Sequence, residues 1–350
     1  MGINEARAKI DEIDDQLLEL LEKRMGLVQE IGAFKRENQA AIYRPARERE
    51  ILKRLARRKG LLNEYAIEAI FQEIFAASRL LERSERIAFL GPIGSFTHQA
   101  AESRFGATGD YLRMQSIGAV FEAVESARAK YGVAPIYNNT SGLVGDTLER
   151  LATSDLLIVG DLEMKIRHCF ASRAENLNRV KRIYSKDAAF GQCEAFLAGH
   201  DLGEIERAPI ESTAKAAKLA SQEEDAAAIC SHIAAKLHNL PIMFDNIQDS
   251  GENATRFVIL SDFVNPPSGD DTTSIIAQTP NKPGALFALL KEFNDAEINL
   301  TQIESLPSKG DKRHSRFFID FEGHRDNPSA SATLARIKQY KWLGSYARSL

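Results

Sequence analysis

The sequence predicts a multi-domain chain with an all-helical N-terminal bundle, an α/β middle domain and a small α+β C-terminal module. In roughly the first 35 residues, apolar side chains recur at spacings of mostly three and four, as on one face of a helix. Strand-like and helical runs then alternate between about 87 and 264. From about 272 the order is strand, helix, strand, strand, helix. A length of 350 residues suits two or three domains.

The composition is that of an ordinary globular chain. Hydrophobic residues make up 44% and charged residues 27%, and the formal net charge of −4 gives no global field that favours nucleic acid. No run approaches the ~18 apolar residues of a membrane span, and the charged N-terminus lacks the apolar region of a secretory signal. We therefore expect a cytoplasmic protein that binds neither nucleic acid nor membrane.

Cysteine and histidine usage predicts neither disulfides nor a metal site. Cys169, Cys193 and Cys230 are far apart and form no CxxC pair, so reduced and mostly buried thiols are expected. The seven histidines show no zinc-ligand spacing. We expect no metal and no cofactor.

Residues 1–86 predict a first helix of about 35 residues and two shorter helices over about 45–59 and 63–82. A first helix of that length needs partners along all of it, which suggests a bundle shared between two chains. Lys35 lies 11 positions after Arg24, so the two side chains are about 16 Å apart on nearly the same side of the helix and could hold one small dianion. Arg7 lies about 25 Å before Arg24 and could reach the same ligand only from another subunit. The alternative is that all three are solvated surface charges.

This segment resembles the all-helical chorismate mutase of the bifunctional chorismate mutase–prephenate dehydratase family. The residues that carry the resemblance are Arg7, Arg24, Lys35, Arg47, Glu48 and Ser78. The resemblance implies an intertwined dimer in which Arg7 enters the partner's site, and a one-step pericyclic rearrangement of chorismate to prephenate. Such a site compresses a flexible dicarboxylate and stabilises charge on the breaking ether oxygen.

By this resemblance Arg24, Arg47 and the trans Arg7 clamp the substrate carboxylates, Lys35 donates to the ether oxygen, and Glu48 accepts from the substrate hydroxyl. Two positions depart from the family pattern. Arg44 stands where some members carry an aspartate, and Glu82 where some carry a glutamine that faces the ether oxygen. A carboxyl group could donate there only in its protonated form, which burial favours.

The middle region, 87–264, contains a turn-to-strand junction at 253–257 where the hydroxyl of Thr255 and the guanidinium of Arg256 could meet one small anion. A strand-glycine turn-helix pattern at 86–98 offers a helix N-terminus that suits anions. The alternatives are an ordinary strand start, an ordinary loop and, for the hydroxyl groups at strand ends, simple helix caps.

Taken in order, these segments resemble prephenate dehydratase. The resemblance implies two α/β lobes, as in type II periplasmic binding proteins, with a site between them that converts prephenate to phenylpyruvate. Thr255 then assists the departing hydroxyl, and Arg256 and the loop amides near Ser95 hold carboxylate. The expected prephenate-binding residues are Ser95, Thr97, Asn138, Thr140, Ser185, Gln192, Thr213, Thr255, Arg256 and Phe257.

Two departures from the dehydratase pattern are visible. Tyr137 stands where the family usually carries a glutamate, and Lys186-Asp187 replaces a common His-Pro. A phenol can donate a hydrogen bond to a leaving oxygen but is a much weaker acid than a carboxyl group.

Residues 272–350 follow a linker at 265–271 and predict strands near 273–278, 298–305 and 317–321, with helices near 283–290 and 332–340. This order resembles an ACT regulatory domain, in which phenylalanine binds between paired domains. The expected regulatory residues are Gly284, Ala285, Leu286, Asn299, Leu300, Glu304 and Ser305, and Leu306 replaces the usual arginine. The alternative is a ferredoxin-like domain that only packs.

The resemblances together imply a bifunctional enzyme of phenylalanine biosynthesis that forms a homodimer or a larger homo-oligomer. Its small-molecule partners are chorismate, prephenate and phenylalanine. Two alternatives stay open: an active mutase with a dehydratase-like domain that only binds its ligand, and a metabolite sensor without catalytic activity.

Overall fold

The computed structural model describes residues 2–37, 44–57, 60–82, 85–307 and 313–348. The chain divides into two compact units, residues 1–85 with 105–110 and residues 86–104 with 111–350. No helix among the described residues combines the length and the apolar character that a membrane span requires.

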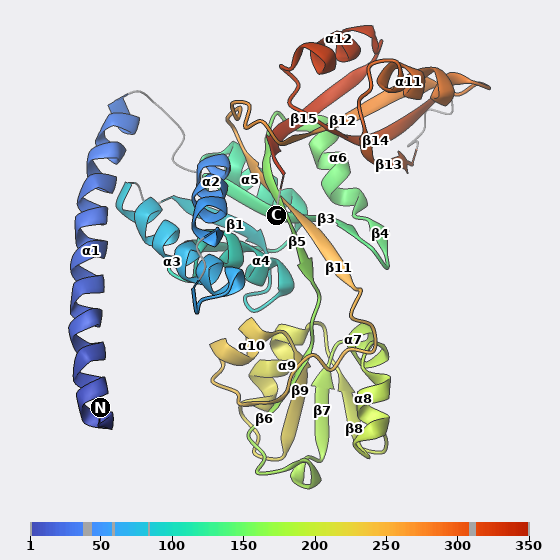
Figure 1. Cartoon of the computed structure of the whole chain (residues 1–350). Coiled ribbons are helices and arrows are strands. Elements are labelled where there is room, and N and C mark those ends of the chain that lie inside the picture. Colours follow the sequence, from blue (N-terminus) through green and yellow to red (C-terminus); the bar gives the residue numbers. More distant parts are fainter. Residues whose placement is uncertain (1, 38–43, 58–59, 83–84, 308–312, 349–350) are drawn as a thin grey trace. The chain divides into compact units, whose positions relative to one another are not determined.

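The first unit is built from three helices, α1 (Ile3–Glu37), α2 (Pro45–Ala56) and α3 (Glu64–Glu82) (Figure 1). The 35 residues of α1 confirm the predicted length. Residues 58–59, which the prediction included in the second helix, lie outside the described residues. Asn63 caps α3, because its side-chain oxygen accepts a hydrogen bond from the backbone N–H of Ala66 at 2.8 Å.

Most of α1 carries apolar side chains that the other described residues leave exposed. The apolar residues that are more than half exposed include Ile10, Ile13, Leu17, Leu20 and Ile31. Val28, nearer the C-terminal end, is buried, as are Leu52 of α2 and Phe75 of α3. A long uncovered apolar stripe is typical of a helix that packs on another chain.

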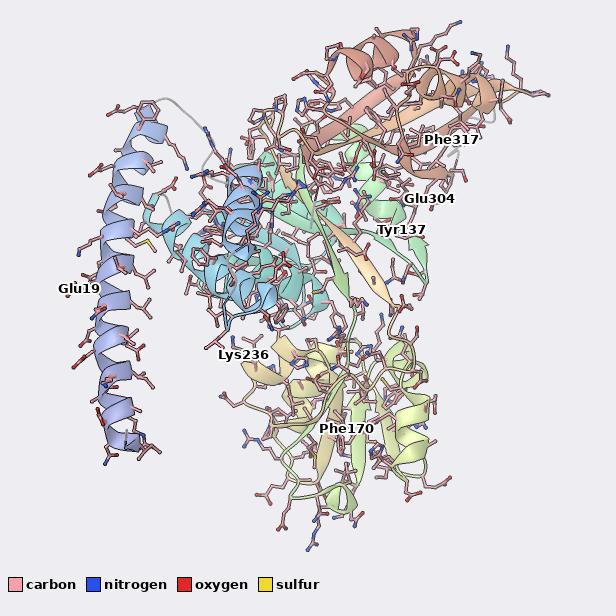
Figure 2. The ribbon with its side chains drawn as sticks, viewed as in Figure 1. Glu19, Tyr137, Phe170, Lys236, Glu304 and Phe317 are labelled. Carbon is pink, nitrogen blue, oxygen red and sulfur yellow. The ribbon has the colours of Figure 1, made fainter. Side chains whose placement is uncertain are left out.

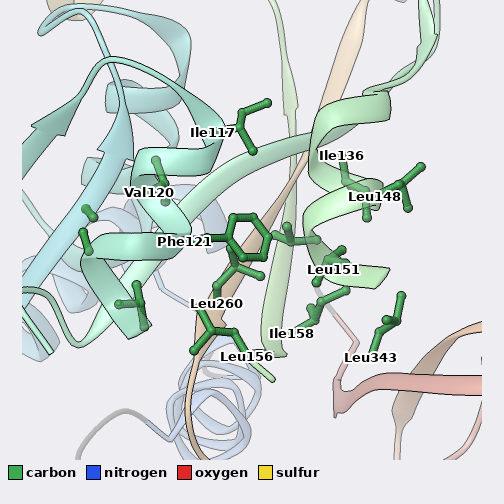
Figure 3. Close-up of a cluster of buried hydrophobic side chains, with 14 of the residues drawn as sticks. Ile117, Val120, Phe121, Ile136, Leu148, Leu151, Leu156, Ile158, Leu260 and Leu343 are labelled. Atoms are coloured by element: carbon green, nitrogen blue, oxygen red, sulfur yellow. The ribbon is translucent and has the colours of Figure 1, made fainter. Parts of the chain in front are cut away.

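The second unit contains the two α/β lobes that the resemblance implied. The first lobe has a mixed sheet in the order β2-β1-β3-β11-β5, with β4 paired to β3. Helices α5 and α6 pack on this sheet and form the buried cluster of Figure 3. Its elements are β1 (Arg86–Leu90), α4 (Phe96–Phe105), β2 (Asp110–Met114), α5 (Ile117–Glu125), β3 (Tyr131–Asn138), β4 (Gly142–Leu143), α6 (Gly145–Thr153), β5 (Leu157–Lys165) and β11 (Ala254–Ser261).

The second lobe is inserted between β5 and β11 and has the sheet order β10-β6-β9-β7-β8. Phe170 lies in its core (Figure 2). Its elements are β6 (Cys169–Ser172), η1 (Leu177–Arg179), β7 (Arg182–Ser185), α7 (Asp187–Gly191), α8 (Glu194–Gly199), β8 (Glu206–Pro209), α9 (Thr213–Ala220), β9 (Ala226–Cys230), α10 (His232–Leu237) and β10 (Ile242–Phe244).

The C-terminal module is an antiparallel sheet in the order β13-β14-β12-β15 with two helices. Its elements are β12 (Asp271–Pro280), α11 (Ala285–Asn294), β13 (Leu300–Leu306), β14 (His314–Glu322), α12 (Pro328–Arg336) and β15 (Tyr340–Ala347). This order confirms the predicted α+β module, and a further strand, β15, follows the second helix. The predicted helix over 332–340 is wrong at its C-terminal end, because Tyr340 already pairs with Ala277 as the first residue of β15.

The C-terminal module shares a hydrophobic core with the first lobe. One face of its sheet packs on α11 and α12, and the other places Phe318 and Leu343 against Leu151 and Ile158 of the first lobe (Figure 3). At Gly344 a Cβ atom would lie 2.1 Å from the carbonyl oxygen of Ile158, so only glycine allows the backbones to approach this closely.

The predicted linker is itself part of this contact. Asn265 is buried and donates to the carbonyl oxygens of Val159 at 2.9 Å and Ser345 at 3.3 Å. Its hydrogen bonds therefore join β5 of the first lobe to β15 of the C-terminal module.

Candidate active sites

A pocket of about 550 Å³ in the helical unit gathers most of the residues expected to bind chorismate. The expected residues that line it are Arg24, Lys35, Arg44, Arg47, Glu48, Ser78 and Glu82. Arg79 lines it too, so five cationic side chains face two carboxylates. This surplus of positive charge suits a dianion.

Arg24 is held by the hydroxyl group of Ser78. Its Nη1 donates to Ser78 Oγ at 2.5 Å, and that hydroxyl donates in turn to the carbonyl oxygen of Ile74 at 2.6 Å. Burial lowers the pKa of Arg24, and the charges of Glu48 and Glu82 partly oppose this change. An incoming carboxylate would replace the water that burial has removed from this guanidinium.

Each of the two carboxylates in the pocket accepts a hydrogen bond from a cationic side chain. Lys35 Nζ donates to Glu82 Oε2 at 2.6 Å, and Arg79 Nη1 donates to Glu48 Oε1. The second oxygen of Glu48, Oε2, is buried and has no hydrogen-bond partner among the described residues. A buried acceptor without a partner is costly unless a ligand supplies a donor. Arg79 was not predicted, because in the sequence it is one more basic residue in the last turn of a helix.

Arg7 is exposed near the N-terminal end of α1 and does not line this pocket. The pocket of a single chain is therefore formed without it, as its distance along the helix led us to expect.

In the second unit, Thr255 and Asn138 meet on neighbouring strands. They are register partners on β11 and β3, and Asn138 Nδ2 donates to Thr255 Oγ1 at 2.9 Å. The same nitrogen donates to Asn253 Oδ1 at 2.8 Å, and Asn138 Oδ1 accepts from the backbone N–H of Thr140 at 3.0 Å. Because Thr255 Oγ1 accepts from Asn138, its own proton is available to a ligand.

The expectation that Arg256 shares a ligand with Thr255 is wrong. Side chains alternate across a strand, so these neighbours lie on opposite faces of the sheet. Arg256 Nε donates to Asp161 Oδ2 at 2.8 Å, and Nη2 donates to the hydroxyl of Tyr346, in the C-terminal module, at 2.8 Å. Its guanidinium therefore faces that module.

Tyr137 follows the same rule. It is the register partner of Arg256 and packs against the core that the first lobe shares with the C-terminal module. Tyr137 consequently lies on the face away from Thr255, and the expectation that it could donate to the leaving oxygen is wrong.

Gln192 belongs to a group that joins the two lobes. Its Oε1 lies 2.9 Å from Nε2 of His168, and the ring of His168 meets Phe96 edge-on, with ring centroids 5.4 Å apart. The second ring nitrogen, Nδ1, is buried without a partner among the described residues. His168 was not predicted, because a single histidine between two strands carries no motif of its own.

Several other predicted residues have structural partners. Ser185 is fully buried and donates to the carbonyl oxygen of Ile229, and Phe257 is buried with 2% of its surface exposed. Ser95 Oγ donates to the carbonyl oxygen of Leu90 at 3.2 Å and accepts from the N–H of His98. Thr97 is buried, and Thr213 is the first residue of α9.

The predicted regulatory residues lie on two elements of the C-terminal module. Gly284 has a φ of 78° and precedes α11, which begins with Ala285 and Leu286. Asn299 precedes β13, which carries Leu300, Glu304 and Ser305 (Glu304 is labelled in Figure 2). Leu306 packs against the core shared with the first lobe, which gives the departure from arginine an apolar role.

The three cysteines are free and buried, as predicted. Burial, with the negative charges of Asp249 and Glu194, raises the pKa of the Cys193 thiol to about 12. A thiol that stays protonated at neutral pH is a poor nucleophile.

We expect His168 to make the second unit less stable in acid. Burial lowers the pKa of His168, although its hydrogen bond to Gln192 opposes this. As the pH falls below the ordinary histidine pKa of about 6.5, the unfolded chain takes up a proton at this histidine before the folded chain does. The free energy of unfolding therefore decreases.

We expect His168→Gln to lose less stability on acidification than the wild type, measured by thermal unfolding across pH. His200→Gln, at an exposed position, is the control; equal acid sensitivity of wild type and His168→Gln would contradict the prediction.

Three family models match the chain one after another. The chorismate mutase type II family matches residues 6–83, the prephenate dehydratase family residues 87–263, and the ACT domain family residues 273–339. The bifunctional chorismate mutase/prephenate dehydratase of Aquifex aeolicus is 38% identical and covers 99% of this chain and 98% of its own length.

Two solved structures each match three quarters of the chain. The prephenate dehydratase of Arthrobacter aurescens in complex with L-Phe is 31% identical, has a TM-score of 0.67, and covers 75% of this chain and 90% of its own. A quorum-quenching acylase is 27% identical, has a TM-score of 0.69, and the match covers 75% of this chain and 98% of the acylase chain. The same fold thus carries different activities, and the assignment of a reaction depends on the site residues.

Proposed function

Because the chain belongs to the family of bifunctional chorismate mutase/prephenate dehydratases, we propose that its helical pocket rearranges chorismate to prephenate and that its second unit converts prephenate to phenylpyruvate at Thr255. The observation that carries the proposal is the helical pocket, which five cationic side chains line together with a buried oxygen of Glu48 that has no hydrogen-bond partner in the described part of the chain. Together the two reactions serve phenylalanine biosynthesis.

In the mutase reaction the protein supplies position and charge rather than acid-base chemistry. Arg24 and Arg47 hold the two carboxylates of chorismate, and Lys35 turns from Glu82 to donate to the ether oxygen as that bond breaks. Glu48 Oε2 accepts from the substrate hydroxyl. The compact conformer held in this way is the one that rearranges.

Arg7 completes the pocket from a second chain, in a homodimer built on α1. Two observations support this arrangement: the exposed apolar stripe of α1, and the position of Arg7 outside the pocket of its own chain. The partner's Arg7 then adds a further cation to a site that binds a dianion.

In the dehydratase reaction prephenate loses carbon dioxide and a hydroxide ion, and its ring becomes aromatic. Departure of hydroxide needs a proton or a strong hydrogen-bond donor at the leaving oxygen. Thr255 supplies that donor, since its oxygen already accepts from Asn138 Nδ2. We expect Gln192, whose Oε1 lies 2.9 Å from His168 Nε2, to contact the substrate from the second lobe.

A variant at position 82 tests the role of Glu82. In the structure the Glu82 carboxylate accepts from Lys35 Nζ at 2.6 Å, whereas an amide at this position could donate to the ether oxygen as well as accept from Lys35. We therefore expect Glu82→Gln to keep or raise kcat/KM for chorismate. A loss of mutase activity in Glu82→Gln would show that the carboxylate itself is needed to hold Lys35.

Phenylalanine is the proposed effector of the C-terminal module, because a similar dehydratase was solved with L-Phe bound. Leu306 packs into the shared core and presents no guanidinium to the ligand, so we expect weak binding. Calorimetric titration of the whole protein with L-phenylalanine measures it. Tight binding would show that the leucine is tolerated, and absence of binding would remove phenylalanine as an effector.

The dehydratase assignment is tested by supplying the purified protein with prephenate and measuring phenylpyruvate. We expect turnover. Prephenate that binds and is recovered unchanged would contradict the assignment and favour a domain that only binds its ligand.

A further inference from the structure

Arg256 occupies a buried polar cluster between the catalytic strand and the C-terminal module. Its Nη1 donates to Gln302 Oε1 at 2.9 Å and to Asp320 Oδ2, and its Nη2 donates to the hydroxyl of Tyr346 at 2.8 Å. These three partners come from β13, β14 and β15. Only Asp161, which accepts from Nε at 2.8 Å, belongs to the first lobe.

The inner members of the cluster are buried and support one another. Asp320 is 1% exposed and Tyr346 0% exposed. Ser274 donates to Asp320 Oδ1 and lies 2.8 Å from the hydroxyl of Tyr346. Removing one partner from such a buried network leaves a polar group without a bond, so the network permits few arrangements.

Each end of this cluster adjoins a segment that carries function. Arg256 follows Thr255 directly on β11, so the two Cα atoms are about 3.8 Å apart. Gln302 lies on β13 between Leu300 and Glu304, within the predicted regulatory segment. Gln302 on β13 is therefore connected to Arg256 by one hydrogen bond, and Arg256 is connected to Thr255 by one peptide bond.

We propose that Arg256 is a positioning residue of the dehydratase, through which the C-terminal module fixes Thr255 and an effector on β13 acts on it. In the free enzyme Gln302, Asp320 and Tyr346 hold the guanidinium, and with it the start of β11. A displacement of β13 moves Gln302, and the strain passes to Arg256 and the adjoining Thr255. This inference rests on the dehydratase activity proposed above.

Two conservative substitutions test it without enlarging or charging the interface. Tyr346→Phe removes the hydroxyl that accepts from Arg256 Nη2. Gln302→Leu replaces the amide that accepts from Arg256 Nη1 with an apolar side chain of similar size. We expect each to lower dehydratase kcat about tenfold with little change in KM, and to raise the half-inhibitory concentration of L-phenylalanine by a similar factor, as for a coupling carried by a hydrogen bond to a charged group. Mutase activity of the same preparations should not change.

Tyr340→Phe is the matched control, because Tyr340 lies on the same strand as Tyr346 and is 40% exposed. It should behave as the wild type. Wild-type kcat and inhibition in both test variants would overturn the proposal. So would a loss of dehydratase activity that only follows lowered thermal stability and lowered mutase activity.

If the wild-type enzyme does not turn over prephenate, the proposed function is refuted. A third measurement tests the role of Arg256 in positioning β11 independently of that outcome. Hydrogen exchange of the segment 254–261 should be faster in Tyr346→Phe than in Tyr340→Phe. Equal exchange in the two variants would show that the cluster does not position β11.

Discussion

Thr255→Ala is expected to lower the dehydratase kcat by about 10²–10³-fold, the usual cost of removing one donor from a transition state. Thr255 Oγ1 accepts from Asn138 Nδ2 at 2.9 Å, which leaves its proton to the departing hydroxyl. The alanine variant keeps the strand pairing but has no donor. KM for prephenate should change little, because the bond to the leaving oxygen strengthens in the transition state.

Two variants serve as controls for this prediction. Thr255→Ser keeps the hydroxyl and should keep most of the activity. Thr153→Ala removes an exposed threonine hydroxyl at the end of α6 and should not affect turnover. An alanine variant at 255 with wild-type kcat would show that another group assists the leaving hydroxide.

We expect Arg7→Ala and Arg24→Ala each to lose most of the mutase activity. When the two variants are mixed and exchange subunits, part of that activity should return. In a mixed dimer, the pocket that keeps Arg24 receives Arg7 from the other chain, and the second pocket lacks both residues. Random exchange makes half of the dimers mixed, so activity should return to roughly a quarter of the wild type.

The matched control mixes Arg24→Ala with Lys35→Ala. Both residues line the pocket of their own chain, so no mixed dimer of these two variants has an intact site. Mutase assays after subunit exchange compare the two mixtures. Equal activity in both, or no recovery in the first, would contradict a site completed by the partner's Arg7.

The fold could be predicted from the sequence wherever local periodicity carries the information. The spacing of apolar residues in α1 indicates its length, and the alternation of strands and helices indicates the α/β lobes. In the helical unit the spacing of Arg24 and Lys35 along one helix indicated a common ligand, whereas Arg44, Arg47, Glu48, Ser78 and Glu82 followed only from the family resemblance. Arg79 was missed because its role depends on Glu48, which is 31 positions away in the sequence.

The two faces of β11 required the structure. The period of two along a strand separates Thr255 from Arg256 once the strand is known to begin at Ala254. The position of Tyr137 depends on the register between β3 and β11, which are more than 100 residues apart in the sequence. The packing of the C-terminal module on the first lobe is equally non-local.

The register between β3 and β11 weakens the alternative that the middle domain binds its ligand without catalysing a reaction. That alternative depended on Tyr137 replacing a glutamate near the leaving group. Tyr137 instead packs on the face opposite Thr255, so its exchange for a carboxyl group changes the interface with the C-terminal module rather than the chemistry.

A single chain that performs two consecutive reactions at separate sites should release phenylpyruvate from chorismate only while Thr255 is intact. Chorismate is supplied to the wild-type enzyme and to Thr255→Ala, and prephenate and phenylpyruvate are followed by chromatography. We expect phenylpyruvate from the wild type and accumulation of prephenate at an unchanged rate in the variant. Phenylpyruvate formed equally by both proteins, or prephenate as the end product of the wild type, would contradict this expectation.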